Sequence, residues 1–306
     1  MRLRLLFPFL LITFFSFGQS VAVIVPGTKI SMVPPKGYVV ASNFSGFQNR
    51  DIGAAIIIAE LPDSFQATKA TFTPEGFKTQ GMTLHNQKPV TIQGGRSAEL
   101  YRASQNENGT QVQQLLLLFG DESKSVLLNA SFLNPSNATE EEITKALLTA
   151  SYNDKQSLNA EKSVKFKIRT EGTPYKFASI VTGTLLYSKD GKVPTLSPDK
   201  AFLLVGNSLT VIKMENPEQY SLNRLRKFPG CAEALIKNVQ PVTIDKLNGY
   251  EIVAEAKGTE GKNELKYLVM LFDTNGDYLL IHGSVSADFN NNLKTFKSIA
   301  QTFSKK

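Results

Sequence analysis

The chain has 306 residues, of which 42% are apolar and 20% are charged, and its formal net charge is +7. This composition excludes collagen-like and intrinsically disordered chains, and the length favours two globular domains. The single cysteine, Cys231, excludes an intramolecular disulfide, so packed cores must hold the domains together. We expect Cys231 to be a small buried side chain and not a nucleophile.

Residues 1–20 have the layout of a secretory signal peptide. Arg2 and Arg4 precede an apolar run over residues 5–17, and small residues follow, so cleavage is expected after Gly18 or Ser20. As a helix, this run would rise about 20 Å, too short for a hydrocarbon core of about 30 Å. We therefore expect a secreted or periplasmic protein with no transmembrane span after cleavage.

The charge is distributed unevenly between the halves of the remaining chain. Residues 21–155 contain 11 Lys and Arg against 12 Asp and Glu, whereas residues 156–306 contain 21 against 15. The first half therefore has a net charge of −1 and the second half of +6. A basic second half favours an anionic ligand or surface as its partner.

In the first half, the apolar run at residues 54–61 predicts a strand buried on both faces. Asp63 or Ser64 can cap a following helix, and Pro74 suits the start of another. A three-strand meander is then expected, starting at Val90-Thr91-Ile92 and ending near residue 132. A helix closes this half, and the spacing of Thr139 and Glu142 predicts a capping box at its start.

In the second half, alternating Lys or Arg and apolar residues at 165–169 predict an edge strand with a charged outer face. Further strands are expected at 175–181, 185–187, 201–205 and 209–212. Asn216 is expected to cap a helix that Pro229-Gly230 ends. A meander beginning at Val242-Thr243-Ile244 follows, and Asp288 starts a final helix with an apolar stripe.

The two halves repeat the same order of elements, so we predict an α+β fold of two tandem domains, each an antiparallel β-sheet packed with helices. The polar stretch near residues 153–161 is the best boundary. The expected organisation is a signal peptide at 1–20, a first domain at 21–153, a linker at 154–162 and a second domain at 163–306.

Five segments resemble the PsbP-like superfamily: Lys36-Gly37-Tyr38, Val90-Thr91-Ile92, Val242-Thr243-Ile244, Gly249-Tyr250-Glu251 and the helix at 289–303. The resemblance covers most of both halves and implies two tandem α/β/α sandwiches. It also implies a mostly non-enzymatic protein that acts by binding other proteins, so no catalytic residue is carried over. An insertion at residues 188–197 departs from the pattern.

The residue types needed for catalysis or metal binding are sparse. His85 is placed in a polar loop and His282 in the third meander strand, where the first half has Asn129. Neither has a second ligand at metal-binding spacing, so we expect no metal site and no cofactor. A serine triad stays open, because its members need not be adjacent in sequence.

Other carboxylates have simpler expected roles. Glu99 and Glu251 are expected at matching strand positions, facing solvent. The sequence Asp273-Thr274-Asn275-Gly276-Asp277 begins like a calcium loop, but Ser284 stands where the loop needs glutamate, so we predict a hairpin turn.

Arg224, Arg226 and Lys227 are the candidate contacts to an anionic partner, and a solvated helix face is the alternative. They lack interleaved aromatic residues for base stacking, so we expect no nucleic-acid binding. The leading hypothesis is a non-catalytic binding or assembly protein of the cell envelope with a protein partner. The alternatives are a carrier of a small apolar or anionic ligand, and a hydrolase with an interdomain site.

Overall fold

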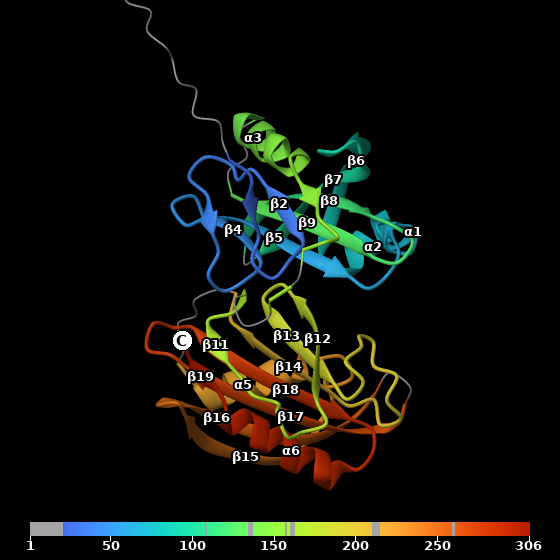
Figure 1. The fold of residues 1–306 in the computed structure, drawn as a ribbon. Coiled ribbons are helices and arrows are strands. Elements are labelled where there is room, and N and C mark those ends of the chain that lie inside the picture. Colours follow the sequence, from blue (N-terminus) through green and yellow to red (C-terminus); the bar gives the residue numbers. More distant parts are fainter. Residues whose placement is uncertain are drawn as a thin grey trace, which may run out of the picture.

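A computed structural model describes residues 21–107, 109–133, 137–156, 158–159, 163–209, 215–258 and 261–306. It contains two seven-stranded antiparallel sheets, one in each half of the chain, and Figure 1 shows them as separate bodies. The expected signal peptide lies outside the described residues, as does most of the strand expected at 209–212. Among the described residues, no helix has the length and apolarity needed to cross a membrane.

The first sheet is covered by helices on both faces. Its strands, in spatial order, are β3 (Val39–Val40), β4 (Gly46–Asn49), β5 (Ala54–Leu61), β9 (Ser125–Phe132), β8 (Thr110–Gly120), β7 (Ser97–Glu107) and β6 (Met82–Thr91). Helix α3 (Asn137–Leu148) packs on one face, and α1 (Phe65–Thr71) and α2 (Pro74–Thr79) pack on the other. A small sheet of β1 (Val23–Ile24), β2 (Ile30–Met32) and β10 (Ser151–Tyr152) adjoins it.

The second sheet has the same arrangement. Its strands, in spatial order, are β12 (Lys176–Val181), β13 (Thr184–Ser188), β14 (Phe202–Asn207), β18 (Tyr278–Val285), β17 (Asn263–Phe272), β16 (Leu247–Lys257) and β15 (Leu235–Ile244). Helix α6 (Phe289–Gln301) packs on one face and α5 (Pro217–Arg226) on the other. Strand β11 (Phe166–Lys167) pairs with β19 (Ser304–Lys305). The predicted α+β fold of two sheet-and-helix domains is confirmed.

Strand pleating divides each core into two apolar layers, because successive side chains in a strand point to opposite faces. In the second sheet, Leu203, Val269 and Ile281 belong to the layer that includes α6. Leu268 and Met270 belong to the layer that includes α5. Each sheet is therefore buried on both faces, which explains the continuous apolar runs of its central strands.

The two sheets match in detail as well as in strand order. In both, the outermost long strand has a register shift: between Leu84 and Asn86 in β6, and between Ile236 and Asn238 in β15. Both strands also contain a proline at the corresponding place, Pro89 and Pro241. A proline has no N–H to donate, so it suits the unpaired side of an edge strand.

The sequence misplaced the start of both meanders. Val90-Thr91 and Val242-Thr243-Ile244 end strands of ten residues, β6 and β15, and do not begin them. Each meander therefore has four strands and not three. The reason is exposure: β6 and β15 are mostly solvent-exposed and lack the apolar alternation by which the buried strands were recognised.

Helix starts were predicted with mixed success. Ser64 and Asn216 are N-caps whose side chains accept hydrogen bonds from Ala67 N and Gln219 N, as predicted. The capping box at Thr139 is wrong, because α3 already begins at Asn137. Asp288 does precede α6, but in a left-handed conformation, and its carboxylate accepts from the Asn291 side chain instead of the backbone.

The strand expected at 165–169 is also shorter than predicted. Only β11, Phe166–Lys167, is paired, because its partner β19 has just two residues. The Asp273–Asp277 segment forms the predicted hairpin turn, closed by a hydrogen bond of 2.8 Å from Asp273 N to Asp277 O.

Candidate ligand pocket

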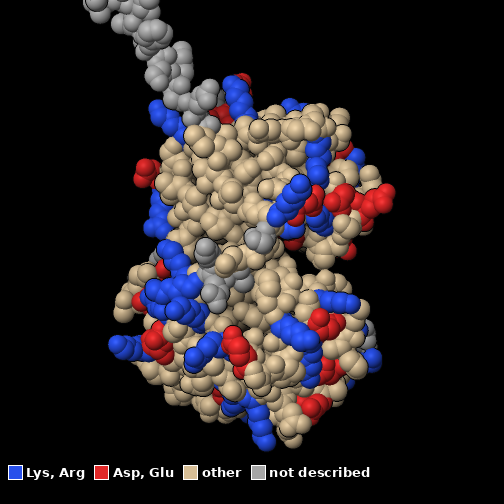
Figure 2. Space-filling view, viewed as in Figure 1, with Lys and Arg blue, Asp and Glu red and all other residues tan. Residues whose placement is uncertain are grey.

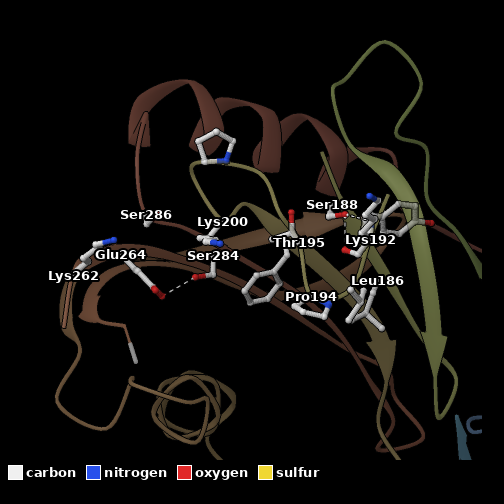
Figure 3. Close-up of a pocket in the computed structure, with 14 residues that line it drawn as sticks. Leu186, Ser188, Lys192, Pro194, Thr195, Lys200, Lys262, Glu264, Ser284 and Ser286 are labelled. Atoms are coloured by element: carbon white, nitrogen blue, oxygen red, sulfur yellow. Dashed lines mark hydrogen bonds between the residues drawn. The ribbon is translucent and has the colours of Figure 1, made fainter. Parts of the chain in front are cut away.

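A pocket of about 470 Å³ opens on the second sheet, on the face that α5 also covers. Strands β13, β14 and β18 contribute its floor, and the loop between β13 and β14 forms its wall (Figure 3). This loop is the segment at 188–197 that interrupts the sequence repeat. The pocket therefore has a wall that the short β4–β5 turn of the first sheet, residues 50–53, does not provide.

The walls of the pocket are largely apolar. Leu186 and Phe202 line it from the sheet, and Val193 and Pro194 line it from the loop. Phe202 is held in an edge-to-face contact with the ring of His282, with ring centroids 6.0 Å apart. A fixed aromatic ring beside aliphatic side chains suits the apolar part of a small ligand.

Three lysines also line the pocket: Lys192, Lys200 and Lys262. All three are exposed, as is typical of long cationic side chains at the rim of a site. They come from separate segments, two from the β13–β14 loop and one from the β16–β17 turn. Their charges favour a ligand that carries a negative group.

The polar end of the pocket rests on a buried ion pair. Lys266 is 4% exposed, and its Nζ donates to Glu264 Oε2 at 2.5 Å and to Ser284 Oγ at 2.9 Å. Ser284 Oγ lies 3.1 Å from the same carboxylate oxygen (Figure 3). Lys266, Glu264 and Ser284 thus form one closed cluster of polar contacts.

Asp190 organises the loop that forms the wall. Its Oδ1 accepts from Ser188 Oγ and Thr195 Oγ1, each at 2.9 Å, and its Oδ2 accepts from Leu196 N at 2.7 Å. Desolvation acts to raise the pKa of Asp190, but these hydrogen bonds outweigh it and hold the pKa well below its usual value. The pocket wall is thereby fixed before any ligand arrives.

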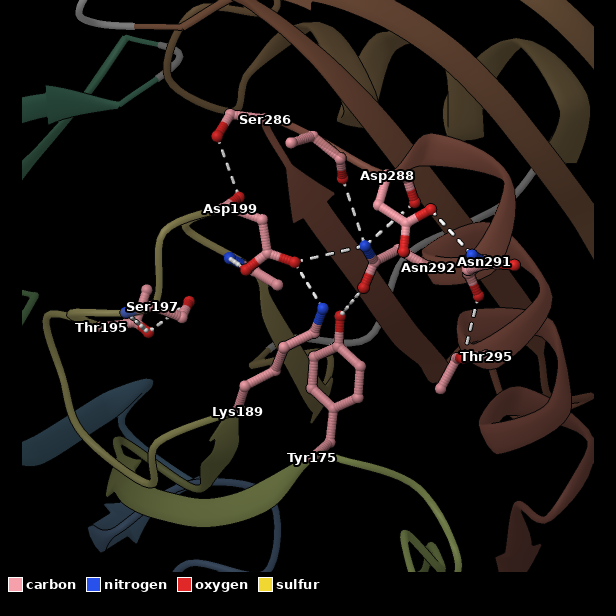
Figure 4. A network of polar contacts seen from close by, with 12 residues as sticks. Tyr175, Lys189, Thr195, Ser197, Asp199, Ser286, Asp288, Asn291, Asn292 and Thr295 are labelled. Carbon is pink, nitrogen blue, oxygen red and sulfur yellow. Dashed lines mark hydrogen bonds and ion pairs between the residues drawn. The ribbon is translucent and has the colours of Figure 1, made fainter.

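A second polar network ties the end of the loop to helix α6 (Figure 4). The Asp199 carboxylate pairs with Lys189 and accepts from Asn292 Nδ2 at 3.3 Å, and Asn292 Oδ1 accepts from Tyr175 OH at 2.9 Å. Burial acts to raise the pKa of Asp199, but the hydrogen bond and charge of Lys189 lower it. Ser286 N donates to Asp199 O, which joins the loop to the end of β18.

The two histidines lie in different sheets and do not form one site. His85 lies in β6 and not in a loop as predicted; it is exposed, and its Nε2 is 2.7 Å from Ser104 Oγ. His282 lies in β18 as predicted and is 2% exposed, stacked on Phe228 with centroids 4.0 Å apart. Burial, with the nearby charges of Lys266 and Arg224, lowers the pKa of His282 to about 3.

Cys231 is fully buried, as expected, and burial raises the pKa of its thiol. Within the described residues, no group of three His, Cys, Asp or Glu side chains is placed to hold a metal ion. A cavity of about 230 Å³ lies between the halves, but neither histidine lines it. The alternative of a hydrolase with an interdomain site therefore has no histidine in this cavity.

The candidate anionic contacts at the end of α5 differ in exposure. Arg224 is partly buried, and its guanidinium lies over the Phe228 ring, 5.0 Å from the centroid. Arg226 and Lys227 are exposed. In the view of Figure 2, Lys and Arg gather near the junction of the halves and elsewhere alternate with Asp and Glu.

Glu99 and Glu251 do not occupy matching positions, and neither faces solvent. In the strand register, Glu99 is paired with Leu118 and Glu251 is paired with Val269. These partners are one residue apart when the two sheets are aligned, so the two glutamates do not correspond. Glu99 is 8% exposed and pairs with Lys69 of α1 at 2.5 Å. Glu251 is 4% exposed and pairs with Lys297 of α6 at 2.6 Å, on the opposite face of its sheet.

Sequence reasoning missed the pocket because its residues are scattered and individually ordinary. The one usable signal for the pocket is the insertion at 188–197, which departs from the PsbP-like pattern. The sequence alone does not indicate that this insertion forms a pocket wall. The lysines of the rim contributed only to the positive charge of the second half. Their convergence depends on the sheet order, which brings β13, β14 and β18 together.

The fold and the pocket define an α+β protein of two helix-covered sheets with a site of small-molecule size. No family model matches the chain, and no curated protein matches it. Its fold is similar to a crystal structure of a Bacteroides thetaiotaomicron protein, with a TM-score of 0.32 and 16% identity, over 49% of this chain. The chain spans 53% of that protein's length.

Two further solved structures are similar. One is cyanobacterial PsbP from Synechocystis, with a TM-score of 0.31 and 12% identity, over 45% of this chain and 96% of that protein. The other is an immunity protein of the type VI secretion system of Pseudomonas aeruginosa, with a TM-score of 0.32 and 11% identity, over 93% and 97%.

Proposed function

We propose that this protein is a non-catalytic binding protein of the cell envelope, and that the pocket of its second sheet takes a small anion with an apolar body. One observation carries the proposal: the apolar walls formed by Leu186 and Phe202 converge with three lysines on one cavity. A cavity of this volume that combines apolar side chains with convergent polar ones is typical of small-molecule sites. The polar lining also includes Glu264, Ser284 and Ser286. The proposed export of the protein is supported by the signal-peptide pattern of residues 1–20.

We further propose that the two domains are tandem copies of one ancestral unit of PsbP-like type, joined by a linker at 154–162. The shared strand order, the register shift in both outer strands and the prolines at corresponding places support this origin. The insertion at 188–197 then gave the second copy a pocket wall. Binding of a small anion is then a property that the second copy gained.

A protein partner is the second candidate. Arg226 and Lys227 are both exposed at the end of α5, and they favour an acidic surface as the partner. Arg226 could form two parallel hydrogen bonds with a carboxylate of such a partner, and these would fix the orientation of the contact. A small ligand in the pocket and an acidic partner at α5 are separate functions, and different variants test them.

The test of the pocket uses octanoate, with octan-1-ol as its uncharged counterpart, in calorimetric titrations of the full mature chain. We expect octanoate to bind more tightly than octan-1-ol. The double variant Lys192→Gln, Lys200→Gln should weaken octanoate binding about fivefold, because exposed charges contribute modestly, and it should reduce the salt dependence. The matched control is Lys36→Gln, Lys155→Gln, which changes two exposed lysines outside the pocket. Equal affinity for both ligands, or equal loss in both double variants, would overturn the proposal.

A further inference from the structure

The first sheet has a pocket of its own, at a place unrelated to the site described above. This second pocket, of about 360 Å³, is lined by Phe72, Phe77, Met82, Leu116, Leu127 and Asn129 among others. It lies on the face covered by α1 and α2. Thr71, Thr79 and Gln80 also line it, and Phe72 and Phe77 contact each other edge to face.

The second sheet shows what occupies the corresponding place there. Asn129 is paired with Leu116 in the strand register, and His282 is paired with Leu268, so Asn129 and His282 correspond. In the second sheet, the Phe228 ring lies flat on His282, with 5° between the ring planes. Leu268 and Leu280, which correspond to Leu116 and Leu127, pack in the same apolar layer.

The covering helices explain the difference between the sheets. Helix α5 has ten residues and is followed directly by the segment that carries Phe228. In the first sheet, two helices of seven and six residues, α1 and α2, take its place. Their aromatic side chains pack over Tyr101, with Phe72 and Phe77 centroids 4.9 Å and 5.9 Å away. Leu116, Leu127 and Asn129 are thus left to line a cavity.

Asn129 adds a polar requirement to this cavity. Its Oδ1 is buried and has no hydrogen-bond partner among the described residues. A buried acceptor without a donor lowers the stability of the fold, and a ligand that donates one hydrogen bond would remove this cost. The cavity therefore combines a mainly apolar, ring-sized space with an unmet acceptor on one of its lining residues. Because Oδ1 is closed to solvent, the Asn129 amide must turn for a ligand in the cavity to reach it.

We propose that this pocket of the first sheet binds a small planar aromatic molecule that carries one N–H or O–H donor. The ring takes the place that Phe228 holds in the second sheet, and the donor bonds to Asn129 Oδ1. The ligand class differs from the anion proposed for the second sheet, and the two sites share no residue. The binding is therefore independent of the proposed function.

Indole is the probe, because it is planar and has one N–H donor. The chain contains no tryptophan, so the fluorescence of indole can be followed without overlap from the protein's own indole rings. Benzofuran, which has the same shape and lacks the donor, is the comparison ligand, followed by its effect on protein methyl resonances. Two variants are used: Asn129→Leu removes the acceptor at similar size, and Leu127→Phe fills the cavity from its wall.

We expect indole to bind the full chain and to shift methyl resonances of Leu116 and Leu127. Asn129→Leu should weaken indole binding about fivefold, the worth of one hydrogen bond, and leave benzofuran binding unchanged or stronger. Leu127→Phe should abolish binding of both, and Lys192→Gln, at the other pocket, should change neither. If Leu127→Phe fails to fold, the contrast between the two ligands in Asn129→Leu still decides. Absence of binding, equal loss of both ligands in Asn129→Leu, or shifts confined to the second sheet would overturn the proposal.

Discussion

At the scale of single residues, the second sheet is distinguished from the first by titratable side chains at two buried positions. Lys266 and His282 stand where the first sheet has Gln114 and Asn129. Lys266 is 4% and His282 2% exposed, so both depend on their immediate neighbours. Two predictions follow from those neighbours, one for stability and one for its dependence on pH.

Replacing Lys266 with Met should destabilise the protein by roughly 3 kcal/mol at neutral pH. The reason is that Glu264 loses the cation that compensates its partly buried charge. The double variant Lys266→Met, Glu264→Gln should recover most of this loss, because no unpaired charge is left behind. Urea unfolding of the four proteins in this cycle gives the coupling energy. Additive losses would contradict the ion-pair account.

Replacing His282 with Asn, the residue of the first sheet, should flatten the pH dependence of stability. The folded protein holds the pKa of His282 at about 3, against about 6.5 for an unperturbed histidine, chiefly through burial. Between these values only the unfolded chain binds the proton, so the stability of the protein falls as the pH decreases from about 6.5 to about 3. Above about pH 6.5 the contribution of neutral His282 to stability is fully present. At pH 5 the loss is about 2 kcal/mol. Unfolding at pH 7 and pH 5 measures it, and an unchanged difference in His282→Asn would contradict the assignment.

At the scale of elements, the loop between β13 and β14 has a wall-forming role that depends on Asp190. Replacing Asp190 with Ala removes the acceptor for Ser188, Thr195 and Leu196. We expect octanoate affinity to fall about fivefold, because the ligand must then order the loop as it binds. The sheet should keep its stability, since the loop lies outside the strand ladder.

Asp121 provides the matched control for this prediction. It organises the β8–β9 turn in the same way, accepting from Ser123 N at 2.8 Å and from Lys124 N at 3.1 Å, but it lies in the first sheet. Asp121→Ala should therefore leave octanoate affinity unchanged. A similar loss of affinity in both variants, or in neither, would show that the wall does not need Asp190.

The elements also show which parts of the fold can be predicted from the sequence. Buried strands such as β5 and β17 and the amphipathic helix α6 were predicted because burial leaves a periodic apolar pattern. The outer strands β6 and β15 were misjudged because exposure erases that pattern. The pocket was not predicted, since it arises where strands distant in sequence become neighbours: β14 pairs with β18 across more than seventy residues.

At the scale of the whole molecule, the two halves contact each other at Asn43 and Gly183, among other residues. Asn43 Nδ2 donates to Ser208 O at 3.0 Å and to Leu209 O at 2.7 Å. Gly183, in the β12–β13 turn, lies against the backbone of Phe44. Because each half has an apolar core of its own, we expect each to be held mainly by its own packing, so that the junction can be altered without unfolding either sheet.

Gly183→Ala tests this junction, and Gly172→Ala is its control. Both glycines have a left-handed backbone, with φ of +80° and +78°, so alanine costs about 1–2 kcal/mol of local strain at either. Only at Gly183 would the added Cβ approach the other half, 3.0 Å from Phe44 Cα, whereas at Gly172 it meets nothing within 4 Å. We therefore expect Gly183→Ala to lose more stability than the control on urea unfolding, because Phe44 must give by a few tenths of an ångström to admit the methyl group. Identical unfolding of the two variants would mean that the contact between Gly183 and Phe44 does not contribute to the stability of the junction.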